Sequence, residues 1–152
     1  MAYLSTVERV ILGHTKTKDG DTSMKAVVCQ NEQLSVRERQ ELKPAKGQVL
    51  LKVLRCGICG SDLHLRHHCD HMAAMAKRVG FDHFPSSKDE VVFGHEFCGE
   101  VLEHGKGTSK KLKVGTRVCA VPLLRRDTHI DLTGISAHAP GAYAEQLLVQ
   151  EA

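Results

Sequence analysis

The sequence predicts a single mostly β domain, built as a small barrel. Short runs of apolar or alternating residues recur along the chain, and glycine or proline residues separate them. Only one stretch, from about 62 to 79, has the composition of a helix. With 152 residues, 41% apolar and 26% charged, the chain has room for one domain with a real core, and not comfortably for two. Many short strands with few helices are typical of small barrels.

The composition also excludes several classes of protein. The net charge of +3 does not by itself require a nucleic-acid partner, and no apolar run is long enough to cross a membrane. The N-terminal residues lack the uninterrupted apolar stretch of a signal peptide. We therefore expect a cytoplasmic protein whose six cysteines are thiols or metal ligands rather than disulfides.

The domain is expected to begin near residue 23. Residues 1–22 are polar and lead into the turn-like sequence KDGDTS, after which the pattern changes sharply. We expect residues 1–22 to be an N-terminal extension, poorly ordered or loosely packed, and the domain to occupy residues 23–152.

The first strands form a predicted hairpin, in which MKAVVCQ and LSVRERQEL flank the polar turn Asn31–Glu32. A proline and a glycine follow, and QVLLKVLRC then alternates apolar and polar residues as a strand does. The glycines of CGICGSD end that strand. Ser61 and Asp62 can cap a helix that begins near Leu63.

The helix is expected over about 62–79 because its middle is rich in alanine and methionine. Three more strand regions follow, separated by glycine-containing turns: VVFGHEFCGEVLEHG, VGTRVCAVPLL and GAYAEQLLV.

The first chemical motif is the pair Cys56-x-x-Cys59 at the end of a predicted strand. Such a pair can be half of a zinc site, a redox dithiol or two buried thiols. A four-cysteine zinc ribbon needs a second pair of this spacing, which the remaining cysteines do not supply. The pair alone also resembles the thioredoxin type, so a dithiol oxidoreductase is an alternative at this point.

The second motif is Gly94-His95-Glu96, entered from the apolar run VVF. A histidine beside a glutamate is more often structural than catalytic when it stands alone. Zinc, however, takes thiolate sulfur and imidazole nitrogen, and a catalytic site leaves one position open. Cys59 and His95 are therefore candidate zinc ligands. Glu96 is either a third ligand or a carboxylate that transiently replaces the bound water.

The third motif, Ser61-Asp62-Leu63-His64, follows Cys59 almost directly. A hydroxyl beside a zinc-bound substrate can take its proton, and a histidine one helical turn further on can pass that proton to solvent. Asp62 is placed to orient a ligating imidazole. The simpler alternative is that these residues only cap a helix.

Together and in this order, CGICGSDLH, GHEFCGEVLEHGKG, VGTRVCAVP and GAYAEQLLV resemble the GroES-like catalytic domain of the zinc-dependent medium-chain alcohol dehydrogenases. The resemblance covers residues 24–149. It implies a GroES-like, partly open β-barrel, mainly β with short helices. It also implies an NAD(P)-linked oxidoreductase that interconverts alcohols with aldehydes or ketones.

The same resemblance implies that Cys59, and not Cys56, is a ligand of one catalytic zinc. His95 matches the ligating histidine, and Glu96 matches the conditional ligand beside it. The implied proton relay consists of Ser61 and His64. Asp62 matches the acidic residue that orients a ligand without binding the metal.

The sequence departs from the family's pattern because it shows no sign of a nucleotide-binding domain. Such enzymes place a doubly wound nucleotide-binding domain after this one, with a glycine-rich turn at a helix N-terminus. The nearest candidate, GKGTSK at 105–110, lacks the third glycine and a surrounding βαβ unit, so we expect no cofactor-binding residue here. The family's third protein ligand also comes from further downstream. We therefore expect a truncated domain with an incomplete zinc shell, inactive alone, with NAD or NADP bound only in the complete enzyme.

The segment LLRRDTHIDLTGISAHAP contains none of the four cysteines that hold a structural zinc in some family members, so none is expected. The predicted helix is histidine-rich. On a regular helix, His64, His67, His68 and His71 share one face, which is compatible with a second metal site. A solvated face at the mouth of the cleft is the favoured interpretation.

A second hypothesis is a stand-alone zinc-binding or self-associating module derived from the same domain. The dithiol hypothesis becomes much weaker, because it leaves the Gly-His-Glu motif unexplained. The expected partner is a small-molecule alcohol or carbonyl substrate in the complete enzyme, and a homo-oligomer is compatible with either hypothesis. We expect no nucleic-acid or membrane partner.

Overall fold

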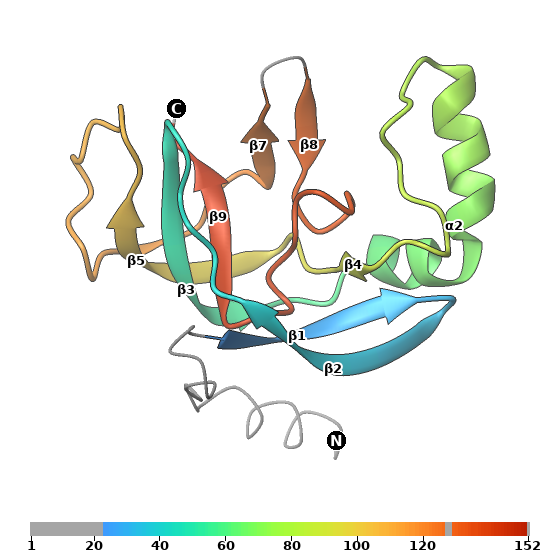
Figure 1. The fold of residues 1–152 in the computed structure, drawn as a ribbon, viewed down its shortest axis with the longest axis horizontal. Coiled ribbons are helices and arrows are strands. Elements are labelled where there is room, and N and C mark those ends of the chain that lie inside the picture. The colour runs from blue at the N-terminus through green and yellow to red at the C-terminus, as the bar shows by residue number, and fades with distance from the viewer. Residues whose placement is uncertain (1–22, 127–128, 152) are drawn as a thin grey trace.

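The computed structural model describes residues 23–126 and 129–151, which form a mainly β domain with a helix along one side (Figure 1). The extension expected over residues 1–22 lies outside the described residues. Within the described ranges, no helix combines the length and the apolar character needed to cross a lipid bilayer.

The described part of the chain begins with the predicted hairpin. Strand β1 (Ser23–Gln30) pairs antiparallel with β2 (Gln33–Gln40), and the turn residues are Asn31 and Glu32, with φ of 49° and 64°. Positive φ at both central positions is the geometry of a type I′ turn, whose twist matches that of the flanking strands. Asparagine adopts this conformation more readily than most residues, which favours a tight hairpin here without glycine.

The strands within residues 23–126 and 129–151 form three sheets. The first has the order β2-β1-β4, the second β6-β5-β3-β9, and the third is the hairpin β7–β8. The bounds of the later strands are Gln48–Cys56 for β3, Val91–Val92 for β4, Phe97–His104 for β5, Arg117–Val118 for β6, Leu123–Arg125 for β7, Ile130–Leu132 for β8 and Gln146–Gln150 for β9. Strand β3 is central in the second sheet, because it pairs antiparallel with both β5 and β9.

One short segment joins the first two sheets. The Tyr143 carbonyl accepts a hydrogen bond from the Val27 N–H of β1 at 2.7 Å. Two residues further on, the Glu145 carbonyl accepts from the Val53 N–H of β3 at 2.9 Å, and the Glu145 N–H donates to the Lys25 carbonyl of β1 at 3.1 Å. The backbone hydrogen bonding is thus continuous from one sheet to the next, in agreement with the partly open barrel that was predicted.

The later strand regions are more interrupted than the sequence predicted. The run VVFGHEFCGEVLEHG gives β4 and β5 with a break at Gly94, VGTRVCAVPLL gives β6 and β7, and of GAYAEQLLV only QLLV lies in β9. The break is caused by contacts with a segment that is distant in the sequence. The Gly141 N–H donates to the Val92 carbonyl at 2.8 Å, and the Tyr143 N–H donates to the Phe93 carbonyl at 2.9 Å. The backbone around Gly94 therefore forms hydrogen bonds with residues 141–143.

The core is aliphatic, as expected from the scarcity of aromatic residues. The largest cluster comes mostly from β3, β5 and β9, and its buried members are Val49, Leu51, Val53, Phe97, Val101, Ala142, Leu147 and Val149. A second cluster comes mostly from β1 and β4, with Met24, Ala26, Val28, Val92 and Ala144. Both clusters include residues of the segment before β9, so burial of apolar surface reinforces the junction between the sheets.

Helix α2 (Gly60–Arg78) confirms the predicted helix, although it is bent. Its residues Leu65 and Cys69 are buried in one apolar cluster with Cys29 of β1 and Phe93. His68 has non-helical φ and ψ of −132° and 25°, which interrupts the helix and changes its direction (Figure 1). Burial of Leu65 and Cys69 beside Cys29 holds the first part of α2 against β1, close to the loop that follows β3.

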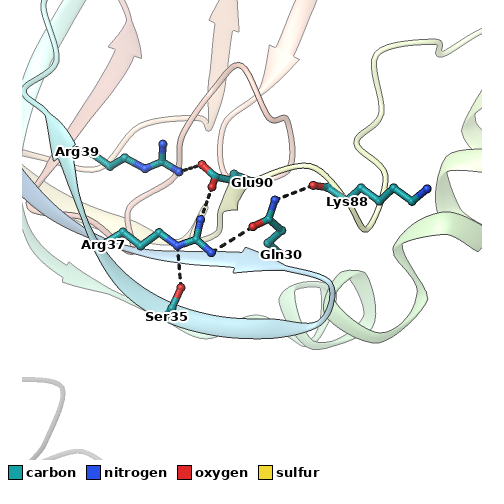
Figure 2. A network of polar contacts seen from close by, with 6 residues as sticks. All are labelled: Gln30, Ser35, Arg37, Arg39, Lys88 and Glu90. Atoms are coloured by element: carbon teal, nitrogen blue, oxygen red, sulfur yellow. Dashed lines mark hydrogen bonds and ion pairs between the residues drawn. The ribbon is translucent and has the colours of Figure 1, made fainter.

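A second link joins the hairpin to the residues before β4. Glu90 accepts hydrogen bonds from the guanidinium groups of Arg37 and Arg39 of β2, as Figure 2 shows. Arg37 also donates to the side chains of Ser35 and Gln30, at 3.0 and 3.2 Å. The hydrogen bond from Arg39, with the positive charges of Arg39 and Arg37, holds the pKa of Glu90 below its ordinary value.

Candidate metal centre

The ends of β3 and β5 bring the predicted zinc ligands together. The last residue of β3 pairs with the first residue of β5, so the loop after β3 and the loop before β5 begin at the same point. The Gly57 N–H then donates to the Glu96 carbonyl at 2.7 Å. Cys59 lies on one of these loops and His95 on the other.

Cys59, His95 and Glu96 form a compact donor group. One ligand atom from each lies within 4.8 Å of the others, and no second group of this kind occurs within residues 23–126 and 129–151. Cys59 and His95 are partly buried, whereas Glu96 is exposed. Thiolate sulfur, imidazole nitrogen and carboxylate oxygen are all donors that zinc takes in proteins. The fold therefore assembles the predicted ligands, with the carboxylate on the solvent side.

Asp62 connects the two loops. Helix α2 begins at Gly60 with Cys59 as its N-cap, earlier than the predicted start near Leu63, so Asp62 occupies the third helical position. Its Oδ2 atom accepts the Cys59 N–H at 2.9 Å, which satisfies an N–H group at the start of the helix. Its Oδ1 atom lies 3.3 Å from Nδ1 of His95, and both of these atoms are buried without a well-formed hydrogen bond.

The orientation of His95 fits a metal ligand. A carboxylate beside Nδ1 favours the proton on that nitrogen, which leaves Nε2 unprotonated and able to coordinate. The Nε2 atom lies 3.1 Å from Oγ of Ser61, so the hydroxyl can donate to it when no metal is bound. The donor chemistry and the position of Asp62 behind the imidazole both fit a zinc ion.

The two predicted relay residues are placed differently. Ser61 contacts His95 directly, whereas His64 is exposed on α2, with its ring centroid 4.8 Å from that of His68. Among the described residues, no hydrogen bond links Ser61 to His64. The relay stays a prediction.

The histidines of α2 do not gather into a metal site in the described structure. His68 interrupts the helix, so the regular spacing that placed four histidines on one face is broken. His67 lies 3.3 Å from the carboxylate of Glu32 at the hairpin turn. A solvated face, the interpretation favoured from the sequence, agrees with the exposure of these side chains.

Cys56 is unlike a redox nucleophile. Its thiol is half-buried, and burial together with the negative charge of Asp62 raises its pKa to about 12. Dithiol oxidoreductases depend on a thiol whose pKa is lowered instead. The donor group contains Cys59 and not Cys56, which is the choice that the sequence motif implied.

Tyr143 is a residue of the site that sequence reasoning missed. Its hydroxyl donates to Oδ2 of Asp62 at 3.0 Å and lies 3.3 Å from the Gly57 carbonyl. Burial, followed by the charge of Asp62, raises the pKa of Tyr143, so the phenol remains a neutral donor. It lies 81 positions after Asp62 in an apolar run, where no local pattern marks it as polar in function.

Comparison with known proteins identifies the family of the chain. Residues 45–152 match the model of the alcohol dehydrogenase GroES-like domain. The chain is 40% identical over 97 residues to L-threonine 3-dehydrogenase of Streptomyces coelicolor, a match that covers 62% of this chain and 25% of that protein. It is 35% identical over 109 residues to (R,R)-butanediol dehydrogenase of Bacillus subtilis, covering 70% of this chain and 30% of that protein.

Solved structures share the fold. A putative zinc-binding dehydrogenase from Sinorhizobium meliloti, bound to NADP, superposes with a TM-score of 0.62 at 30% identity, over 84% of this chain and 36% of that one. The 2R,3R-butanediol dehydrogenase structure from Bacillus subtilis gives a TM-score of 0.61 at 29% identity, over 84% of this chain and 38% of that one. The chain thus spans about a quarter to two fifths of the length of these relatives. On its fold and its sequence, the chain belongs to the alcohol dehydrogenase GroES-like domain family.

Proposed function

We propose that this chain is the catalytic-domain portion of a zinc-dependent, NAD(P)-linked alcohol dehydrogenase. The observation that carries the proposal is the convergence of Cys59, His95 and Glu96, whose ligand atoms lie within 4.8 Å of one another. Zinc held by this group supplies a Lewis acid that polarises the oxygen of an alcohol or carbonyl substrate. Membership of the family supports oxidoreduction as the reaction class.

In this proposal the chain's own residues have separate tasks. Cys59 and His95 hold the metal, and exposed Glu96 is a third or conditional donor. Asp62 keeps the proton of His95 on Nδ1, so that Nε2 stays available. The Oγ atom of Ser61, next to Nε2, is placed to accept the hydroxyl proton of a substrate beside the metal.

His64 completes the proposed relay because it is exposed on the same helix, where an imidazole exchanges protons with solvent. Proton transfer from Ser61 to His64 would then need a bridging water molecule. A nicotinamide nucleotide bound in the complete enzyme would supply the acceptor for the hydride that leaves the alcohol carbon. The relative bound to NADP supports this assignment.

The chain as given is expected not to turn over alone, since no residue in it is assigned to nucleotide binding. A chimera tests the proposal. Residues 23–152 are joined in frame to the remaining part of (R,R)-butanediol dehydrogenase of Bacillus subtilis, a relative 35% identical to this chain. The chimera should bind zinc and reduce NAD with alcohol substrates, and Cys59→Ala should abolish both properties.

The matched control is Cys56→Ala, which should retain zinc and turnover because Cys56 lies outside the donor group. Turnover of alcohols with NAD by the chain alone would show that the expected inactivity is wrong. A folded, zinc-loaded chimera that binds nucleotide and never reduces it would contradict the catalytic assignment.

The alternative of a self-associating zinc-binding module has one observation in its favour. Ile58 and Leu63, on either side of Cys59, are 71% and 55% exposed. A contiguous exposed apolar surface beside a site can form a contact between proteins. Light scattering of the zinc-loaded chain distinguishes the two functions: a dimer that Ile58→Asp and Leu63→Asp convert to a monomer supports the module.

A further inference from the structure

We propose that Tyr143 is a positioning residue of the zinc site, which acts by holding the carboxylate of Asp62 in the orientation that faces His95. The inference rests on the proposed zinc-binding function and extends it to a residue outside the donor group. Tyr143 lies in the segment before β9, far along the chain from the loops that carry the donors.

The backbone of Tyr143 is fixed on both sides. Its N–H donates to the Phe93 carbonyl at 2.9 Å, and its carbonyl accepts from the Val27 N–H of β1 at 2.7 Å. The ring contacts the His95 loop as well: a Cβ atom built on Gly94 would lie 2.7 Å from Cδ1 of Tyr143. Both the backbone and the ring of Tyr143 are therefore held in place, and the position of the hydroxyl is fixed with them.

The hydroxyl supplies the second hydrogen bond to Oδ2 of Asp62. The carboxylate is 3% exposed, so it depends on protein donors rather than water. Its Oδ2 atom accepts two of them, the Cys59 N–H at 2.9 Å and the Tyr143 hydroxyl at 3.0 Å. With Oδ2 held between two donors, Oδ1 is directed at Nδ1 of His95.

Loss of the hydroxyl leaves Oδ2 with only one donor and allows the carboxylate to rotate. His95 then loses the fixed acceptor that holds its proton on Nδ1, and the loop carrying Cys59 loses part of its anchor. Partners of this kind behind a ligating histidine change metal affinity by about 10- to 100-fold. Tyr143 contributes through Asp62, so its effect should depend on the presence of that carboxylate.

The test compares Tyr143→Phe with Ser136→Ala in the full chain. Phenylalanine keeps the ring and its packing and removes only the hydroxyl. Ser136 is the matched control because its buried hydroxyl also donates to a buried carboxylate, Oδ1 of Asp131 at 3.0 Å, and neither residue belongs to the donor group. Competition titration with a chromophoric chelator should show zinc and cobalt affinity about tenfold lower for Tyr143→Phe and unchanged for Ser136→Ala.

A double-mutant cycle with Asp62→Asn distinguishes positioning from a general structural effect. If Tyr143 acts through Asp62, Tyr143→Phe causes little further loss of affinity in the Asp62→Asn background. Equal losses in both backgrounds, or wild-type affinity in Tyr143→Phe, would overturn the inference.

A readout that needs no metal separates this inference from the proposed function. In the metal-free chain, Tyr143→Phe should accelerate hydrogen exchange of the Cys59 amide about tenfold, because that N–H bonds the same carboxylate oxygen. Accelerated exchange in a protein that binds no zinc would support the positioning role and refute the zinc site. Unchanged exchange in a zinc-binding protein would refute the positioning role alone.

Discussion

The Oδ1 atom of Asp62 lies 3.3 Å from Nδ1 of His95, although the two residues belong to different loops. The same carboxylate binds the Cys59 N–H through its other oxygen. One buried acid therefore contacts the backbone of one candidate ligand and the side chain of another. The geometry of the site depends on this residue as much as on the donors themselves.

Replacing Asp62 with asparagine should weaken zinc binding by about 10- to 100-fold, because an amide is a poorer acceptor for the Nδ1 proton than a carboxylate. Competition titration with a chelator measures the affinity. Asp89→Asn is the control, since Asp89 also accepts a backbone N–H, that of Ser86 at 2.7 Å, but in the exposed loop before β4. Equal affinities of wild type and Asp62→Asn would remove Asp62 from the account of the site.

Replacing Gly94 with alanine should destabilise the fold, by about 1–3 kcal/mol from the backbone alone. Gly94 has φ of 98°, and an added Cβ would lie 2.7 Å from Cδ1 of Tyr143 and 2.8 Å from Sγ of Cys56. Chemical denaturation measures the free energy of unfolding. Gly80→Ala isolates the backbone effect, because Gly80 has φ of 82° and open space around its Cα.

The steric part of the Gly94→Ala effect is the excess over the Gly80→Ala effect. If the two substitutions cost the same free energy of unfolding, the close packing of Gly94 against Tyr143 and Cys56 is not a feature of the folded protein.

The link between Glu90 and the two arginines predicts a pH dependence. Because the pKa of Glu90 in the folded chain is below its ordinary value of 4.5, the ionised carboxylate stabilises the fold above that pH. The stabilisation is lost as the pH falls through the lowered folded-state pKa. Melting temperatures measured between pH 7 and pH 3 should therefore decline more steeply for wild type than for Glu90→Gln.

A parallel decline of the two melting curves would show that Glu90 contributes nothing to acid sensitivity. Added salt should reduce the difference between the two proteins, because Glu90 and its arginine partners are partly exposed to solvent.

The sequence predicted elements with strong local signals and missed those set by distant contacts. The first hairpin, β3 and α2 follow from alternation, turn residues and helix propensity, all of which are local properties. The break at Gly94 was not predicted, because it depends on hydrogen bonds to residues 141–143. The helix start was placed too late because a cysteine is an uncommon N-cap, and here Asp62 satisfies the N–H of Cys59 instead.

The residues of the candidate site also fall into those that local motifs predicted and those that depend on distant contacts. Cys59, His95 and Glu96 were identified because their motifs are short and contiguous, and the structure brings them together. Tyr143 was invisible because a tyrosine in an apolar run looks like a core residue until its hydroxyl is seen beside Asp62. The proposed partner of Ser61, His64, remains without a direct contact among the described residues.

Metal stoichiometry tests the central claim most directly. The purified chain is loaded with zinc, freed of excess metal by gel filtration and measured for zinc per chain by atomic emission, alongside Cys59→Ala, Cys56→Ala and a variant with His67 and His71 replaced by alanine. The account predicts one zinc in wild type, in Cys56→Ala and in the histidine variant, and none in Cys59→Ala. Unchanged zinc in Cys59→Ala, with loss in the histidine variant, would contradict it and place the metal on α2.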